Sequence, residues 1–282
     1  MHNRPRSFRE MEKLSVMLWF AIFLGVTVFL AGARQSSTVG GPTLPSVSAG
    51  PAAEIVPPPP QYRFPDGQTY VYGVEWHVFN AGTTRVSIRD DGAEQHVTAT
   101  AISSGVVNSF YKVNDHAEAF FDARRFCSQR VLKHIEEGSR VRQLELNFDY
   151  ARGKSVLSER NLKTGEEKHE ENDIPGCVTD MVSGFYYLSS LPLQVGSTYA
   201  FLVNDGGKTN VIEAQVEARD KVKVPAGSFE ALRVRAEAIS GLMKGKGTVW
   251  AWFTDDANHV PVMMRSKLNW GTLLFRLQEI EK

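Results

Sequence analysis

The chain is 282 residues long, and its 32 lysines and arginines balance its 32 aspartates and glutamates, so the formal net charge is zero. A balanced chain lacks the basic surface that a nucleic-acid-binding protein uses to contact phosphates, so we expect no nucleic-acid partner. Hydrophobic residues make up 42% of the chain and aromatic residues 10%. This composition supports a packed core and excludes a wholly disordered protein.

The first 33 residues have the pattern of a segment that directs a protein to a membrane. Residues 1–13 form a leader with a net positive charge, and residues 14–33 contain no charged residue. A helix of this length, at a rise of about 1.5 Å per residue, matches the roughly 30 Å hydrocarbon core of a bilayer. Because the positive charges precede the apolar run, we expect the N-terminus to stay in the cytoplasm and the rest to be exported.

Two interpretations of residues 14–33 stay open. A retained signal anchor, through which the membrane is a partner of the chain, is favoured because the apolar run exceeds a typical signal-peptide core. A cleaved signal peptide is favoured by Ala31 and Ala33, which flank Gly32 in a small-x-small cleavage pattern. Both interpretations place the bulk of the protein on the far side of the membrane.

A linker follows. Residues 34–61 are rich in Pro, Ser, Gly and Ala and contain no aromatic residue, so they cannot bury enough apolar surface to offset the entropy cost of ordering. We therefore expect a disordered linker in which the four prolines at 57–60 form a stiff polyproline spacer. A single exported domain is expected over residues 62–282.

Apolar alternation with a period of two dominates this domain and predicts β-strands. Tyr70, Tyr72 and Trp76 share one face of the first strand, and Asp90-Asp91-Gly92 is typical of a hairpin turn. Similar turns continue to the C-terminus and predict an antiparallel meander. Helices are expected only over residues 104–112 and 178–190, the second of which ends before Pro192.

Four stretches resemble a bacterial family of exported β-proteins that is known only as a domain of unknown function. They are DMVSGFYYL at 180–188, LPLQVG at 191–196, VPAGSF at 224–229, and WFTDD at 252–256 followed by VPV at 260–262. The resemblance implies a mainly β fold, namely a curved antiparallel meander or partial barrel with one or two short helices. It also implies an envelope location: the bacterial inner membrane with the domain in the periplasm, or the periplasm after cleavage behind Ala33. The architecture is loosely similar to that of half-barrels of the lipoprotein-carrier type, which hold acyl chains.

No catalytic motif is apparent, and no cofactor is expected. The histidines lack the spacing of a helical zinc site, and there is no Cys-x-x-Cys pair, so no metal site is expected. The chain has no G-x-S-x-G nucleophile elbow. Ser183 precedes Gly184 on an apolar helix, which indicates packing, and Asp255-Asp256 reads as part of a turn.

Cys127 and Cys177 are the only cysteines. In an oxidising compartment they are candidates for a disulfide, which would stabilise the fold by about 4 kcal/mol on the chain-entropy model. The alternative is two free, buried thiols, because sequence does not show whether the sulfurs meet.

The aromatic residues carry the functional hypothesis. In a curved sheet the concave face can form a ligand cavity, and the candidate lining residues are Tyr70, Tyr72, Trp76, Phe185, Trp250 and Trp252. The alternative is that they are ordinary core. We therefore expect a non-enzymatic envelope protein that binds an apolar or amphipathic ligand such as a lipid. A structural module in envelope assembly that binds a protein partner is the alternative, and a hydrolase ranks last.

Overall fold

The computed structural model describes residues 53–60, 62–241, 244–245, 247–268 and 271–282. The predicted leader (1–13), the apolar segment (14–33) with Ala31 and Ala33, and most of the linker lie outside the described residues. Among the residues that are described, no helix is long and apolar enough to cross a bilayer.

The described chain forms one antiparallel sheet of fourteen strands. The strands are β1 (Thr69–Trp76), β2 (Phe79–Asp90), β3 (Glu94–Ser103), β4 (Asn114–Asp122), β5 (Ser128–Glu137), β6 (Arg140–Asp149), β7 (Lys154–Asn161), β8 (Glu167–Asp173), β9 (Thr198–Asp205), β10 (Lys208–Val224), β11 (Gly227–Ala238), β12 (Gly247–Thr254), β13 (Pro261–Leu268) and β14 (Gly271–Glu281). The helices are α3 (Gly105–Phe110) and α4 (Met181–Ser190).

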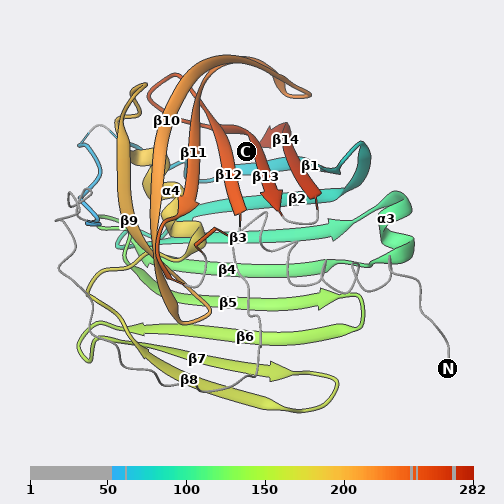
Figure 1. Ribbon diagram of the computed structural model, residues 1–282, viewed down its shortest axis with the longest axis vertical. Coiled ribbons are helices and arrows are strands. Elements are labelled where there is room, and N and C mark those ends of the chain that lie inside the picture. Colours follow the sequence, from blue (N-terminus) through green and yellow to red (C-terminus); the bar gives the residue numbers. More distant parts are fainter. Residues whose placement is uncertain (1–52, 61, 242–243, 246, 269–270) are drawn as a thin grey trace, which may run out of the picture.

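Almost every strand pairs with its neighbours in sequence. The exceptions are that β1 pairs with β14, and that β8 and β9 lie at the two edges of the sheet. The chain is thus two meanders, β1–β8 and β9–β14, joined through β1 and β14. The sheet is strongly curved, so that β3–β8 run across the view in Figure 1 while β9–β12 run up it. The prediction of a mainly β, curved antiparallel meander is confirmed.

Strand alternation decides which side chains face the core. In β4, for example, Ala117, Ala119 and Phe121 are buried, while His116 and Asn114 are exposed. The edge strand β8 alternates exposed and half-buried polar residues over its whole length. Such a charged edge discourages pairing with another chain.

The two predicted helices are present but shorter than expected. Residues 178–180 are not helical because Asp180 caps α4: its Oδ1 accepts the backbone N–H groups of Val182 (2.6 Å) and Ser183 (3.2 Å). The Ser183 Oγ in turn accepts the Asp180 N–H at 2.9 Å, which completes a capping box. Thr179 is extended instead and bridges to Val203 in β9.

Side chains join the two edges of the sheet at one corner. The β9–β10 turn reaches β5 through Lys133 Nζ and Asp205 Oδ1, 3.1 Å apart. It reaches β7 through Ser155 Oγ, which donates to the Gly207 carbonyl at 3.3 Å. The sheet therefore curves back toward itself without a closed ladder of backbone hydrogen bonds.

Candidate ligand site around helix α4

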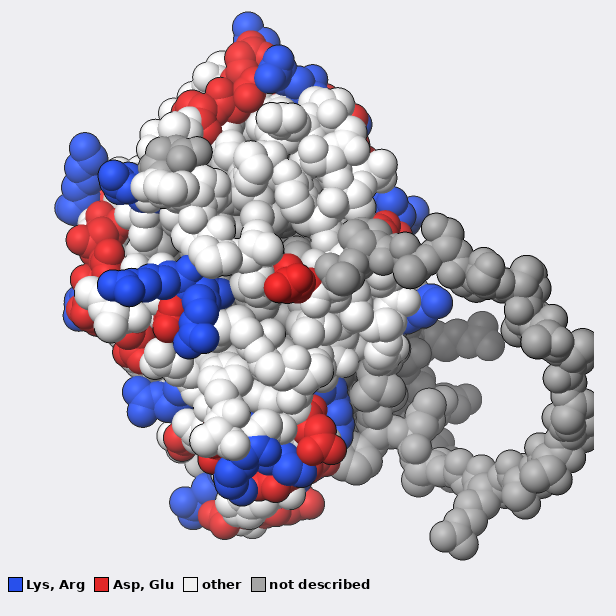
Figure 2. Space-filling model, turned by 90° about the vertical axis from the view of Figure 1, so that its left-hand side faces the viewer, with Lys and Arg blue, Asp and Glu red and all other residues white. Residues whose placement is uncertain are grey.

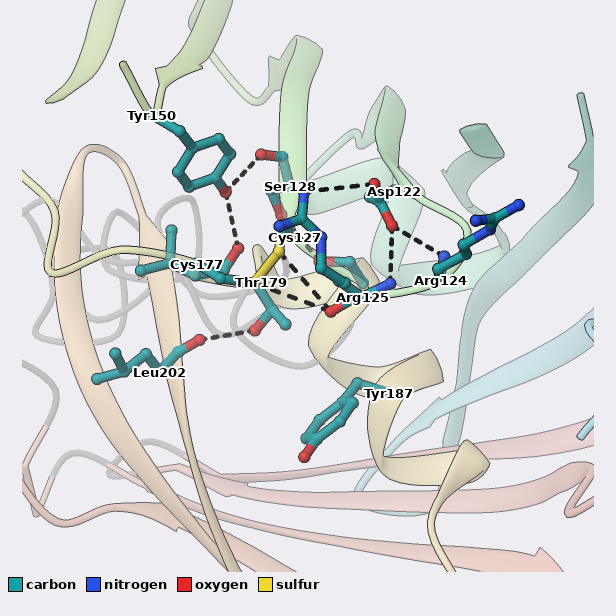
Figure 3. Close-up of a disulfide and its surroundings, with 12 residues drawn as sticks. Asp122, Arg124, Arg125, Cys127, Ser128, Tyr150, Cys177, Thr179, Tyr187 and Leu202 are labelled. Atoms are coloured by element: carbon teal, nitrogen blue, oxygen red, sulfur yellow. Dashed lines mark hydrogen bonds and ion pairs between the residues drawn. A yellow bond between two sulfur atoms is a disulfide. The ribbon is translucent and has the colours of Figure 1, made fainter. Parts of the chain in front are cut away.

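Helix α4 lies on the concave face, between the two meanders, and contacts β4 and β9 (Figure 1). The segment that leads into α4 is tied to the turn after β4 by a disulfide between Cys177 and Cys127 (Figure 3). Tyr150 Oη donates to the carbonyl of Ser128 at 2.7 Å. Thr179 Oγ1 donates to the carbonyl of Leu202 at 2.8 Å. These links position α4 against both halves of the sheet.

Two apolar pockets flank one side chain of this helix, Phe185. The first has a volume of about 70 Å³ and lies between α4 and strands β9–β12. Its lining is Met181, Gly184, Phe185, Leu188, Phe201, Val203, Ile212, Val234, Ala236, Glu237, Val249 and Ala251. Small side chains on β11 and β12, such as Ala236 and Ala251, create this space because they stop short of the helix.

The second pocket, of about 30 Å³, lies on the other flank of Phe185. Its lining is Tyr72, Thr84, Val86, Val182, Phe185, Tyr186, Pro261, Met264 and Phe275. Tyr72 Oη donates to the Pro261 carbonyl at 2.8 Å, so its polar atom is satisfied and its ring presents an apolar wall. Burial raises the pKa of Tyr72 well above its ordinary value, so this phenol stays neutral.

The concave face becomes charged toward β5–β8. Lys133 and Asp205 form an ion pair whose side chains are 12% and 13% exposed, and Arg142 Nη1 contacts Glu159 Oε1 at 2.9 Å. Burial raises the pKa of Asp205, against the opposing influence of the Lys133 ammonium. The concave face thus offers an apolar region beside Phe185 and a polar region beside Lys133.

The structure distributes the six candidate lining residues over both faces of the sheet. Phe185 and Tyr72 line the pockets. Tyr70 is buried in the core, and Trp76 packs against the core from the end of β1.

Trp250 and Trp252 lie on the face of β12 away from α4, where they pair across strands with Arg235 and Arg233. Trp252 is nevertheless only 5% exposed and belongs to the buried core, and Trp250 packs against that core. Arg265 stacks over the Trp250 ring at 4.6 Å from its centroid, and Trp252 Nε1 donates to Asp220 Oδ2 at 2.8 Å. The two tryptophans are therefore not part of the candidate site. Met181 and Met264 also line the pockets, although neither was a candidate lining residue. Met181 lies one turn before Phe185 on α4, so helical spacing already placed the two on one face, whereas alternation along β13 is the signal that could have indicated Met264.

A larger but more open groove, of about 300 Å³, lies on the outer face of β4–β8 and is lined by His116, His134 and His169 among other residues. Its carboxylates are already paired. Burial opposes ionisation of Glu118, yet hydrogen bonds from His116 and His96 keep the pKa of that carboxyl below its ordinary value. Among the described residues, no group of three or more histidines, cysteines or carboxylates is arranged to hold a metal ion.

One solved structure shares this fold, and two others align more weakly, all at low sequence identity. A β-barrel-like protein of the DUF1849 domain of unknown function from Brucella abortus aligns with a TM-score of 0.55 and 10% identity, over 82% of this chain and 99% of that one. A proposed lipoprotein from Parabacteroides distasonis aligns with a TM-score of 0.34 and 8% identity, over 81% of this chain and 99% of that one. A proposed exported protein with a YmcC-like fold from Bacteroides fragilis aligns with a TM-score of 0.31 and 11% identity, over 82% of this chain and 100% of that one.

No curated protein matches the chain. A family model does, over residues 71–278, and it is described as a protein of unknown function (DUF3108). This match covers most of the β-sheet and confirms the predicted resemblance to a domain of unknown function: the chain belongs to the DUF3108 family.

Proposed function

We propose that this protein is a non-enzymatic component of the bacterial cell envelope that binds an amphipathic ligand with an acyl chain on the concave face of its sheet. The observation that carries the proposal is the pair of apolar pockets on either side of Phe185. The acyl chain would lie beside Phe185, and the polar group of the ligand would face Lys133, Arg142 and their carboxylate partners.

The pockets are small in the ligand-free protein. Volumes of about 70 and 30 Å³ are well below the roughly 300–1,000 Å³ of a typical ligand site. The walls can adapt, however, because Met181 and Met264 carry unbranched side chains with three rotatable bonds each. A rotation of Phe185 away from the sheet would join the two pockets into one channel.

Two features support an envelope location. The leader and the apolar run at residues 14–33 predict export, and a disulfide persists in an oxidising compartment such as the periplasm. Whether the apolar segment is retained in the inner membrane or removed after Ala33 does not alter the proposal, since both place the sheet in the periplasm.

Two adjacent methionines allow a matched test in cells. Met264 points into the second pocket, and Met263 lies on the opposite face, paired with Trp252. We would introduce the photo-reactive residue p-benzoylphenylalanine at each position of the full chain, irradiate living cells, and identify adducts on the tryptic peptide by mass spectrometry. We expect lipid adducts at position 264, at a yield at least about tenfold above position 263.

Lipid adducts at equal yield at both positions, or none at 264, would exclude the proposal. A protein adduct at 264 would instead favour the alternative, a module that binds a protein partner. The native disulfide, checked by thiol titration, shows for each variant that the fold is intact.

A further inference from the structure

One end of the curved sheet exposes apolar side chains. The turn between β1 and β2 carries Val78 and Phe79, which are 85% and 56% exposed, and α3 carries Val106 and Phe110, at 62% and 67%. None of the residues of α3 is buried. These segments lie at the right of Figure 1, at the end opposite Tyr187 and the first described residues.

The exposed side chains belong to one continuous rim of turns. The Ser104 N–H donates to the Ala81 carbonyl at 2.9 Å, which joins α3 to β2. The Gly138 N–H donates to the Lys112 carbonyl at 2.8 Å, which joins the β5–β6 turn to the residues after α3. The His77 N–H donates to the Thr272 carbonyl at 3.3 Å, which joins the β13–β14 hairpin to the β1–β2 turn. We call these segments the apolar rim: residues 77–80, 104–112, 137–140, 267–268 and 271–272.

The charge on the apolar rim is mainly positive. Lys112, Arg140 and Lys267 are exposed. Glu137, which is 1% exposed, is the acidic residue among the described parts of these segments, so the basic residues outnumber it by three to one. Exposed apolar tips surrounded by lysine and arginine fit an anionic surface.

The opposite end of the sheet differs. There the exposed Asp90 and Asp91 lie at one turn and the exposed Arg124 and Arg125 at another. Figure 2 looks onto this end and shows acidic and basic side chains interspersed around its margin. Mixed charges of this kind do not favour an anionic partner over a neutral one.

We propose that the apolar rim docks onto the surface of a bilayer that contains anionic phospholipid, with Phe79 and Phe110 entering the interfacial region. A protein partner is less suited, since the apolar groups stand on a turn and a one-and-a-half-turn helix that protrude rather than form a flat face. Phenylalanine and valine on such tips gain free energy by leaving water, and each lysine or arginine near an anionic surface adds to binding.

The rim lies at the end of the sheet opposite the first described residues, which follow the predicted membrane segment in the chain. Residues 34–52, which connect that segment to the first described residue, could extend over roughly 60 Å at about 3.3 Å each. This is about twice the ~31 Å length of a nine-residue strand such as β4. The tether is therefore long enough for the rim to meet the same membrane.

The test uses the full chain in proteoliposomes. A fluorescent amino acid is placed at Phe110 on the apolar rim or, as the matched control, at Val195, which is 55% exposed outside the rim. Quenching by bromine-labelled lipid is then measured in vesicles of phosphatidylglycerol with phosphatidylethanolamine, and in vesicles of phosphatidylcholine. Because both probes share the same tether, only direct contact with lipid separates them.

We expect quenching at position 110 in the anionic vesicles at least about fivefold above that at position 195, with most of it lost in phosphatidylcholine. The double variant Lys112→Glu/Lys267→Glu should lose quenching at position 110 while it keeps its disulfide. Equal quenching at both positions, or no lipid quenching at 110, would overturn the proposal. Protection of position 110 from a water-soluble quencher without lipid quenching would also overturn it and indicate a protein partner or a second copy. The readout is independent of ligand binding beside Phe185.

Discussion

Asp180 shows how much of the site depends on one carboxylate. It is 3% exposed, and besides capping α4 it accepts a hydrogen bond from Ser128 Oγ at 2.6 Å. A helix N-terminus also favours a negative charge, because its free N–H groups carry partial positive charge. The side chain therefore sets both the first residue of α4 and the position of that helix relative to β5.

At the residue scale, we predict that the disulfide is a major source of stability. The Cys127→Ser/Cys177→Ser variant should lose about 4 kcal/mol of unfolding free energy, since the bond closes a loop of 50 residues and restricts the unfolded chain. Urea denaturation followed by tryptophan fluorescence measures the difference. Thiol titration of the denatured, unreduced protein should find no free thiol; two free thiols would contradict the structure.

Helix α4 is short, and its helical state depends on packing as well as on its own propensity. It is ten residues long, below the length at which an isolated helix is stable in water. Eight of its residues are buried, because both meanders pack against it. Gly184 lies where α4 packs closely against Thr179 and β9. A Cβ at this position would lie 2.8 Å from Thr179 Oγ1 and 3.2 Å from the Phe201 ring.

At the element scale, we predict that Gly184→Ala destabilises the protein although alanine is the better helix former. Propensity alone would favour alanine by about 1 kcal/mol. The clash with Thr179 and Phe201 should reverse that sign and cost roughly 1–3 kcal/mol. Thermal denaturation by circular dichroism tests this. A stabilised Gly184→Ala would contradict this prediction and mean that α4 is packed more loosely.

At the scale of the whole molecule, curvature brings the two edge strands together. The β9–β10 turn contacts β5, β7 and β8 through Asp205, Gly207 and Lys208, although β8 and β9 are as far apart as the order of strands allows. The same curvature buries, to different degrees, six tyrosines from the first meander, from α4 and from the segment before β1: Tyr62, Tyr70, Tyr72, Tyr150, Tyr186 and Tyr187. Tyr150 is the most exposed of them, at 38%.

These tyrosines predict alkaline unfolding. Burial raises the pKa of Tyr62 to about 12, and it raises the pKa of the other five as well. In the unfolded chain a tyrosine ionises near pH 10. The stability that the buried phenols contribute is therefore complete below about pH 10 and is lost as the pH rises through their folded-state pKa values.

We expect phenolate absorbance to rise in one cooperative step between about pH 10 and 12, together with loss of the β-sheet signal in circular dichroism. A gradual rise near pH 10 with the sheet intact would show that these phenols are accessible in the folded protein.

The sequence by itself determined the elements of this fold, because alternation and turns are local properties of the chain. It predicted the β-rich domain, the hairpin at Asp90-Asp91-Gly92, both helices and the candidate cysteine pair. It did not show which side chains of each strand point to the concave side of the sheet. Strand β12 has apolar residues on both faces, with Val249, Ala251 and Phe253 on one and Trp250 and Trp252 on the other. Only the pairing with arginines of β11 and β13 places the tryptophans on the face away from α4. The pairing of β1 with β14, the position of Phe185 between two pockets and the apolar rim were decided by the tertiary structure, since each depends on how a curved sheet brings distant segments together.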